Sequence, residues 1–293
     1  MTNNRMIDRI VPVTVVLGVI AGLWYGAAIL LNGPQIRERL DNTGDAWSIS
    51  DFVAATWSME RPVLPAPHQI AADFYDSVFD TAIDSKRSLV YHANVTIAAT
   101  ICGFLLGSVL GIALAVGIVH LPVLDRSLLP WIIASQTVPI LAIAPMVIVV
   151  LGSLGIEGLL PKAVISMYLC FFPVAIGMVK GLRSPETLQL DLMRTYSASP
   201  AQVFWKLRWP SATHFLFASL KVAIATSLIG AIVGELPTGA QAGLGARLLS
   251  GSYFGQTVQI WSALVMASLV GVVLVAVIGL AERLVARSMG EAA

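Results

Sequence analysis

Charged side chains are scarce in this sequence. Only 12% of its 293 residues are Asp, Glu, Lys or Arg, against roughly 25% in a typical soluble domain. Hydrophobic residues make up 57%, and the mean hydropathy is +0.81. So little charge cannot cover this much apolar surface in water, which excludes an ordinary soluble globular domain. The net charge of +1 gives no reason to expect a nucleic-acid partner.

Cysteine and histidine are also rare. Cys102 and Cys170 both lie in apolar stretches, so we expect buried free thiols rather than a disulfide or a metal site. The four histidines show no spacing typical of zinc ligands. The sequence also lacks the Gly-x-x-x-x-Gly-Lys-Ser/Thr phosphate loop. Any ATP hydrolysis would therefore take place in another chain.

Long apolar runs are what the sequence has instead. A bilayer core about 30 Å thick is crossed by on the order of 20 apolar helical residues. Six stretches of that kind are nearly free of charge, which predicts an all-α membrane protein with six transmembrane helices. They are residues 10–31, 89–119, 128–151, 159–178, 215–234 and 258–280.

The basic residues indicate the orientation of the spans. Lys and Arg are enriched in the cytoplasmic segments of membrane proteins. Arg5 and Arg9 precede the first span, and six crossings bring the basic segment 180–208 and the tail residues Arg283 and Arg287 to the same side. We therefore expect both termini to be cytoplasmic.

These spans divide the chain into four parts. The first span lies in 1–31, an outer segment covers 32–88, the other five spans form a core at 89–284, and a tail follows at 285–293. In the outer segment, Ile70, Phe74, Val78 and Ala82 recur every four residues, which predicts an amphipathic helix at about 69–86. Residues 32–61 show no period and receive no predicted role.

Glycines recur at intervals of four inside the spans. Gly103, Gly107 and Gly111 share one helical face, and the pairs Gly18 with Gly22 and Gly177 with Gly181 repeat the spacing. Small residues on one face let another helix backbone approach closely. The pattern predicts close helix packing, or helix crossings that move against each other.

The segment 184–210 is charged and carries two sets of helix signals. Ser184 followed by Pro185 predicts the start of a first helix. Ser199, Pro200 and Gln202 predict a second, with Gln202 in capping-box position. Both helices carry apolar residues. These residues either form a docking surface or pack against the ends of the spans.

The sequence from Asp191 to Pro210 resembles the EAA loop of ABC importer permeases. That pattern has an acidic residue, two Ala, a Gly six positions after the acid, and a Pro thirteen positions after the Gly. Asp191 takes the place of the acid, Ser197 that of the Gly, and Pro210 is retained. The resemblance implies contact with an ATPase subunit through Asp191, Leu192, Met193, Tyr196, Ser197, Ala198, Ser199, Pro200, Val203, Phe204, Leu207 and Pro210.

The similarity extends from about residue 64 to 284 and is greatest to the nitrate, sulfonate and taurine branch of these permeases. It includes Leu64-Pro-Ala-Pro67, Gln136-Thr-Val-Pro139, and Glu235 with Gly243-Leu-Gly245. It implies a type I importer permease fold in the bacterial inner membrane, working by alternating access. The implied partners are a second copy of the chain, two ATPase subunits that use ATP and Mg²⁺, and an extracytoplasmic substrate-binding protein. No cofactor is expected in this chain.

Polar residues within spans either bond to neighbouring helices or face a cavity. Pro139 and Pro145 could break the third span and free carbonyls towards a cavity. Two residues outside the spans, Glu235 and Arg247, are expected on the outer side. There they would close a gate, meet a binding protein or be solvated. The candidates for the substrate pathway are Gln136, Thr137, Pro139, Tyr168, Thr226 and Ser227.

Two other functions would need residues that the spans lack. A secondary transporter driven by an ion gradient usually needs acidic residues at mid-membrane, and a membrane enzyme needs grouped catalytic side chains; the spans show neither. No Lys or Arg lies deep in a span to hold an anion. We therefore expect a small neutral or weakly charged organic compound. Among the solutes that the resemblance implies, this favours a heterocycle of vitamin-precursor or pyrimidine type, with sulfonate, taurine and nitrate as alternatives.

Overall fold

The computed structural model describes residues 2–43, 47–237 and 242–289. Every regular segment among them is helical. They form two compact units, one of residues 1–90 with 247–265 and one of residues 91–246 with 266–293. The helices α11 (Leu244–Tyr253) and α12 (Thr257–Ser288) each belong partly to both.

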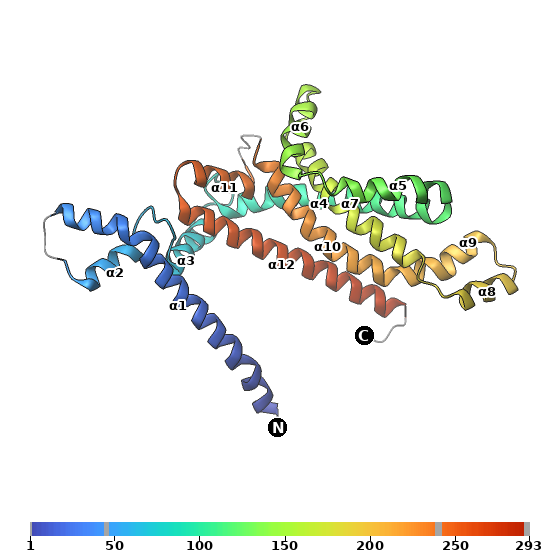
Figure 1. The fold of residues 1–293 in the computed structure, drawn as a ribbon, viewed down its shortest axis with the longest axis horizontal. Coiled ribbons are helices and arrows are strands. Elements are labelled where there is room, and N and C mark those ends of the chain that lie inside the picture. Colours follow the sequence, from blue (N-terminus) through green and yellow to red (C-terminus); the bar gives the residue numbers. More distant parts are fainter. Residues whose placement is uncertain (1, 44–46, 238–241, 290–293) are drawn as a thin grey trace. The chain divides into compact units, whose positions relative to one another are not determined.

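The first unit is built on α1 (Thr2–Thr43), which doubles back into α2 (Ile49–Trp57) (Figure 1). The buried Asn32 on α1 holds the chain that follows α2. Its Nδ2 donates to the carbonyl oxygens of Thr56 and Leu64, at 3.2 and 2.9 Å, and its Oδ1 accepts from the Val63 amide at 2.8 Å. Residues 32–43 and 47–61, which show no period in the sequence, therefore belong to a helical hairpin that the buried Asn32 amide helps to hold.

The predicted amphipathic helix is shorter than expected. It consists of α3 (Pro67–Tyr75) and the π-helical turn η1 (Asp76–Asp80), so the boundary at residue 86 was wrong. Thr81 takes an extended conformation, with φ −95° and ψ 130°. Its hydroxyl donates to the Asp76 carbonyl at 2.9 Å. Helical periodicity in the sequence continued past this point, but a side-chain bond to the backbone ends the helix.

The second unit contains the helices that position the candidate site (Figure 1). Its central helix is α7, which packs against α10 and α4 and carries many of the buried residues. Cys170 on α7 is a buried free thiol, as predicted, whereas the free thiol of Cys102 on α4 is only half-buried. The elements are α4 (Leu89–His120), α5 (Pro122–Ser135), α6 (Ile140–Ser153), α7 (Leu159–Leu182), α8 (Thr187–Thr195), α9 (Pro200–Val203), the π-helical η2 (Phe204–Arg208) and α10 (Trp209–Glu235).

Glycine makes the closest helix crossing possible. A Cβ on Gly107 of α4 would lie 2.2 Å from the Cys170 Sγ and 3.0 Å from the Met167 carbonyl oxygen of α7. A Cβ on Gly181 would lie 2.9 Å from the Ala212 Cα of α10. The prediction of close packing is confirmed for these glycines. It is wrong for Gly18 and Gly22, because a Cβ at either position would have no described atom within 4 Å.

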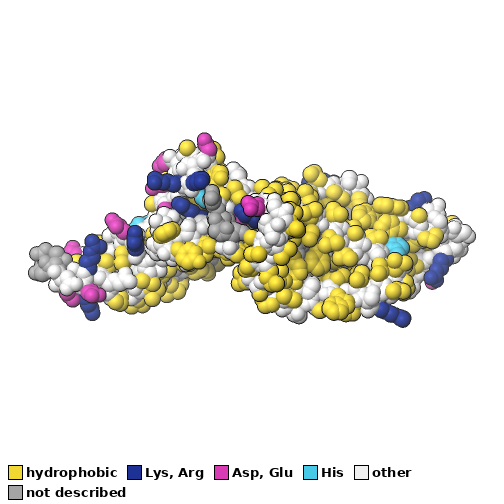
Figure 2. All heavy atoms as spheres, turned by 90° about the horizontal axis from the view of Figure 1, so that it is seen from above, with side chains coloured by type: hydrophobic (Ala, Val, Ile, Leu, Met, Phe, Trp, Pro, Cys, Tyr) yellow, Lys and Arg dark blue, Asp and Glu magenta, His cyan; other side chains and the backbone are white. Residues whose placement is uncertain are grey.

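Five described helices are long and apolar enough to cross a bilayer, covering 11–42, 89–120, 159–182, 200–235 and 257–288. The expected third span is instead a pair, α5 and α6, bent by 99° at residues 136–139. Pro139 lies just before α6 in an extended conformation, where its missing amide breaks no helical hydrogen bond. Figure 2 shows a broad hydrophobic surface with charges in small groups, as lipid contact requires. The predicted all-α fold is confirmed for the described residues, and the expected number of six spans is reached only if this bent pair counts as one span.

Candidate functional site

The segment 184–210 folds into α8, a tight turn, α9 and η2, which extend beyond the ends of α7 and α10 (Figure 1). The second helix starts as predicted. The Ser199 hydroxyl accepts from the Gln202 amide at 3.3 Å, and the Gln202 Oε1 accepts from the Ser199 amide at 2.8 Å. This capping box satisfies amides that the first helical turn cannot.

The first helix starts later than predicted. Ser184 is not its cap, because the Ser184 hydroxyl donates to the Gly181 carbonyl at 2.8 Å and so bonds to the end of α7. The N-cap is Glu186, whose amide donates to the Gln189 side chain at 3.1 Å. The Ser-Pro pair was found close to the start of α8. The serine hydroxyl, however, bonds to the preceding helix α7 and not to the first turn of α8.

The turn between α8 and α9 keeps the geometry that a glycine would adopt. Ser197 has φ +51° and is the one non-glycine residue with positive φ in the described part of the chain. The Ala198 amide donates to the Met193 carbonyl at 3.0 Å, and the Ser197 amide donates to the Arg194 carbonyl at 2.8 Å. These two bonds form a Schellman motif with Ser197 in the left-handed position. The serine at the glycine position of the EAA-like pattern therefore adopts the left-handed conformation that favours glycine.

An exposed apolar face runs along α8. Leu188, Leu192 and Tyr196 are 76%, 56% and 76% exposed, and their spacing of four places them on one side of the helix. We call these three residues the α8 face. Beside it, the exposed Asp191 pairs with Arg194 at 3.0 Å. An exposed apolar row on a short capped helix is typical of a docking surface.

The second half of the segment packs inwards instead. Phe204 of η2 is half-buried against the core, with its ring centroid 5.3 Å from that of His120 and 5.9 Å from that of Trp209. The Arg208 Nη1 donates to the Leu182 carbonyl at 2.9 Å, which ties η2 to the end of α7. Val203 and Leu207 are also half-buried, whereas Pro200 and Pro210 are exposed. The packing interpretation is therefore confirmed for η2, whereas the apolar residues of α8 are exposed and docking through them stays a prediction.

Four of the predicted pathway residues lie around the broken span. Gln136, Thr137 and Pro139 form the break between α5 and α6 and are exposed. The Tyr168 hydroxyl of α7 donates to the carbonyl of Ser135, which is the last residue of α5. The bend and this bond bring residues of the third and fourth expected spans together.

The other two pathway candidates make bonds to helices. The Thr226 hydroxyl donates to the Ala223 carbonyl of its own helix at 3.0 Å. Ser227 is fully buried, and its hydroxyl lies 2.8 Å from both the Thr100 carbonyl of α4 and the Ser166 hydroxyl of α7. Ser227 thus joins three helices, which is the packing alternative that the sequence left open.

Glu235 and Arg247 differ in environment. Glu235 is completely buried, which excludes solvation, one of the three alternatives that the sequence left open for it. It accepts hydrogen bonds from Thr96 and Gly245, and Lys162 lies 3.9 Å away. Arg247 is half-buried; burial lowers the pKa of its guanidinium, and the neighbouring Asp73 opposes that change. Lys162 was missed, although a Lys and a Glu at the outer ends of two predicted spans were a visible signal.

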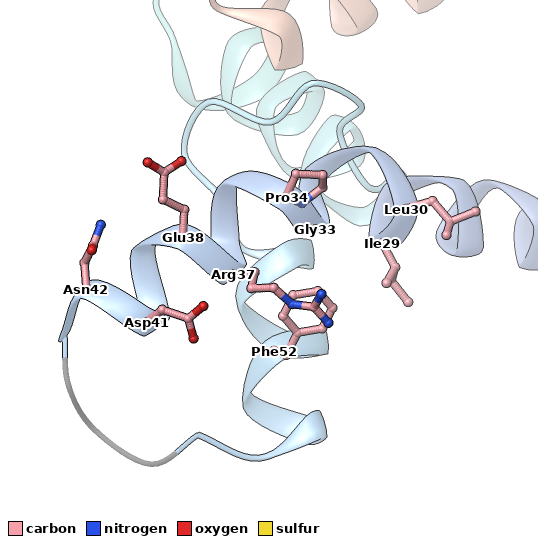
Figure 3. Close-up of a pocket in the computed structure, with 9 residues that line it drawn as sticks. All are labelled: Ile29, Leu30, Gly33, Pro34, Arg37, Glu38, Asp41, Asn42 and Phe52. Atoms are coloured by element: carbon pink, nitrogen blue, oxygen red, sulfur yellow. The ribbon is translucent and has the colours of Figure 1, made fainter.

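A separate groove of about 720 Å³ lies on the hairpin of α1 and α2. Figure 3 shows polar side chains on the last turns of α1 and apolar ones towards its middle. The groove has no counterpart among the sequence predictions. It is lined by Ile29, Leu30, Gly33, Pro34, Arg37, Glu38, Asp41, Asn42 and Phe52.

The family model and the relatives that match this chain are all described as transport components. Residues 107–291 match the family model described as binding-protein-dependent transport system inner membrane component. The formylaminopyrimidine transport permease protein ThiX of Halalkalibacterium halodurans is 32% identical, over 62% of this chain and 68% of its own. The riboflavin transport system permease protein RibX of Chloroflexus aurantiacus is 29% identical, over 77% and 80%. A probable ABC transporter permease protein of Haemophilus influenzae is 29% identical, over 69% and 77%.

Proposed function

Because this chain belongs to the family of binding-protein-dependent transport system inner membrane components, we propose that it forms the translocation pathway of an ATP-driven importer for a small organic solute. It is a multi-pass membrane protein, and its relatives are named ABC transporter permeases. The observation that carries the proposal is the exposed α8 face on a segment that is capped, turned and anchored at defined residues.

The α8 face is the contact for a separate ATPase subunit. Its three apolar side chains fit a groove on such a partner, and Asp191 with Arg194 borders them. Phe204 and Arg208 connect η2 to α4, α7 and α10. A displacement of α8 by the ATPase subunit is therefore transmitted to the spans, because η2 is fixed to them. Two copies of the chain and two ATPase subunits, with both termini of each copy cytoplasmic, complete the importer.

The pathway runs by the broken span. Residues 136–139 interrupt helical hydrogen bonding where Tyr168 reaches the end of α5. Irregular backbone at membrane depth is tolerated where it lines a cavity or is covered by protein. Gln136 and Thr137, both exposed at this break, are the side chains that meet the solute.

The solute is a small neutral or weakly charged heterocycle. The names of two relatives refer to formylaminopyrimidine and to riboflavin. The one lysine found buried in a described span, Lys162, faces Glu235 and donates to the Ala242 carbonyl at 3.1 Å. Its charge is thus already compensated, so it is not available to hold an anion such as sulfonate, taurine or nitrate.

Uptake into proteoliposomes tests this proposal. The complete importer, with its binding protein outside and ATP inside, is given labelled formylaminopyrimidine, riboflavin, ethanesulfonate, taurine or nitrate. We expect uptake of one of the two heterocycles, and none when ATP is omitted. Uptake confined to one of the three other probes would overturn the substrate class, and uptake that does not require ATP would overturn the mechanism.

A further inference from the structure

A buried polar cluster surrounds Glu235, the last residue of α10. One carboxylate oxygen accepts from the Thr96 hydroxyl of α4 at 2.9 Å, and the other accepts from the Gly245 amide at 2.8 Å. The Lys162 Nζ of α7 lies 3.9 Å from the same carboxylate. Both charged side chains are at least nine-tenths buried. The cluster therefore joins three spans and one connecting segment within the second unit.

The connecting segment 242–245 is held at every residue. Lys162 donates to the Ala242 carbonyl at 3.1 Å. The Gly243 amide donates to the His92 Nδ1 at 3.0 Å, and the Leu244 amide donates to the Thr96 hydroxyl at 2.8 Å. With the bond from Gly245 to Glu235, each of the four residues is bonded by a side chain of α4, α7 or α10.

The fit leaves no space for other residues at two positions. Gly243 has φ +123°, and a Cβ there would lie 2.1 Å from the Glu235 carboxyl carbon. A Cβ on Gly245 would lie 2.3 Å from the Ile232 carbonyl oxygen. The segment thus packs directly on the Glu235 carboxylate. A larger residue in place of Gly243 or Gly245 would clash with Glu235 or with the backbone of α10.

An ion pair is a costly way to hold helices together. Burying two charges loses their hydration, and apolar residues of similar size often hold a protein as well or better. Removing one partner leaves the other buried and uncompensated. The pair instead specifies one position of segment 242–245. Only in that position do the Gly245 amide and the Ala242 carbonyl satisfy Glu235 and Lys162.

We propose that Glu235 and Lys162 are positioning residues that clamp segment 242–245 to α4, α7 and α10, so that a partner bound over this end of the three spans moves them together. The partner is the substrate-binding protein. The proposal rests on the proposed function, since the cluster lies at the ends of α7 and α10 opposite to segment 184–210. The 27 residues of α10 span about 40 Å between these two ends.

Two measurements on the complete importer in lipid nanodiscs test the clamp. One is hydrogen exchange of the peptide that covers 242–245, which needs no ligand. The other is the factor by which the binding protein stimulates ATP hydrolysis, when loaded with whichever of the five probes supports uptake. The variants are Glu235→Gln, Lys162→Met and the two combined, with Glu157→Gln as a control on an exposed residue just before α7.

For Glu235→Gln we expect exchange of the peptide to rise, and stimulation to fall, by about tenfold or more, because Lys162 is left uncompensated. The combined variant removes that charge and keeps an acceptor for the Gly245 amide, so both values should return to within about threefold of wild type. A residue needed only for stability would lower the amount of inserted protein but leave stimulation per molecule unchanged.

Unchanged exchange in Glu235→Gln would overturn the clamp, and so would raised exchange with normal stimulation. If Glu235→Gln does not insert, Lys162→Met carries the same expectation, since it leaves the buried Glu235 carboxylate uncompensated. Wild-type importer that takes up no probe with ATP would count against the proposed function instead. The exchange data would still decide whether the clamp exists.

Discussion

Leu192→Asp is expected to abolish ATP-driven uptake while the chain still inserts in the membrane. Leu192 is 56% exposed at the centre of the α8 face, so no core contact is lost. In the proposed importer this position is covered by the ATPase subunit, where an unpaired carboxylate costs several kcal/mol. Each 1.4 kcal/mol weakens binding tenfold, which predicts a loss of affinity of about 100-fold or more. Co-purification of the ATPase subunit and uptake in proteoliposomes measure the two effects.

Thr187→Asp is the matched control for Leu192→Asp. It adds the same charge to an exposed position of α8, about 140° around the helix from Leu192. An acidic residue is also favourable at this end of the helix. Normal uptake by the control with none by Leu192→Asp supports contact through the α8 face. Equal uptake by both variants would mean that this face does not touch the ATPase.

Gly107→Val is expected to prevent correct packing of the second unit. The new Cβ would lie 2.2 Å from the Cys170 Sγ and 3.2 Å from the Phe171 backbone nitrogen. Because backbone atoms block the space, α4 must move away from α7, and overpacking of this kind costs about 1–3 kcal/mol or more. We expect the midpoint of thermal unfolding in detergent to fall by several degrees, with uptake lost.

Gly22→Val serves as the control for the glycine prediction. It makes the same change within a helix, but no described atom lies within 4 Å of the new Cβ. Gly22→Val therefore shows the effect of helix propensity alone. The difference between the two variants gives the effect of lost close packing. A thermal midpoint that falls equally in both variants would contradict the account of the α4 and α7 crossing.

Local signals in the sequence predicted local structure well. Ser199 and Gln202 placed a helix start correctly, because a capping box involves residues only three apart. Pro139 predicted the broken span, because proline has no amide to donate. The EAA-like spacing located the segment with the exposed α8 face, although only the structure separates that face from the inward-packed Phe204.

Long-range pairs could not be predicted in the same way. Lys162 and Glu235 are far apart in the sequence and meet because α7 and α10 pack side by side. Asn32 bonds to residues 56–64 across a hairpin that carries no periodic pattern. Ser184 was misassigned because its hydroxyl can bond to the preceding turn or the following one, and tertiary packing decides between them.

The central claim is that ATP hydrolysis in a partner subunit, rather than an ion gradient, drives transport through this chain. The most direct test is uptake of the accepted probe into proteoliposomes with ATP inside and with proton and sodium gradients collapsed by ionophores. The account predicts uptake at the full rate, and none with a non-hydrolysable ATP analogue. Uptake that stops when the gradients collapse, or that continues with the analogue, would contradict it.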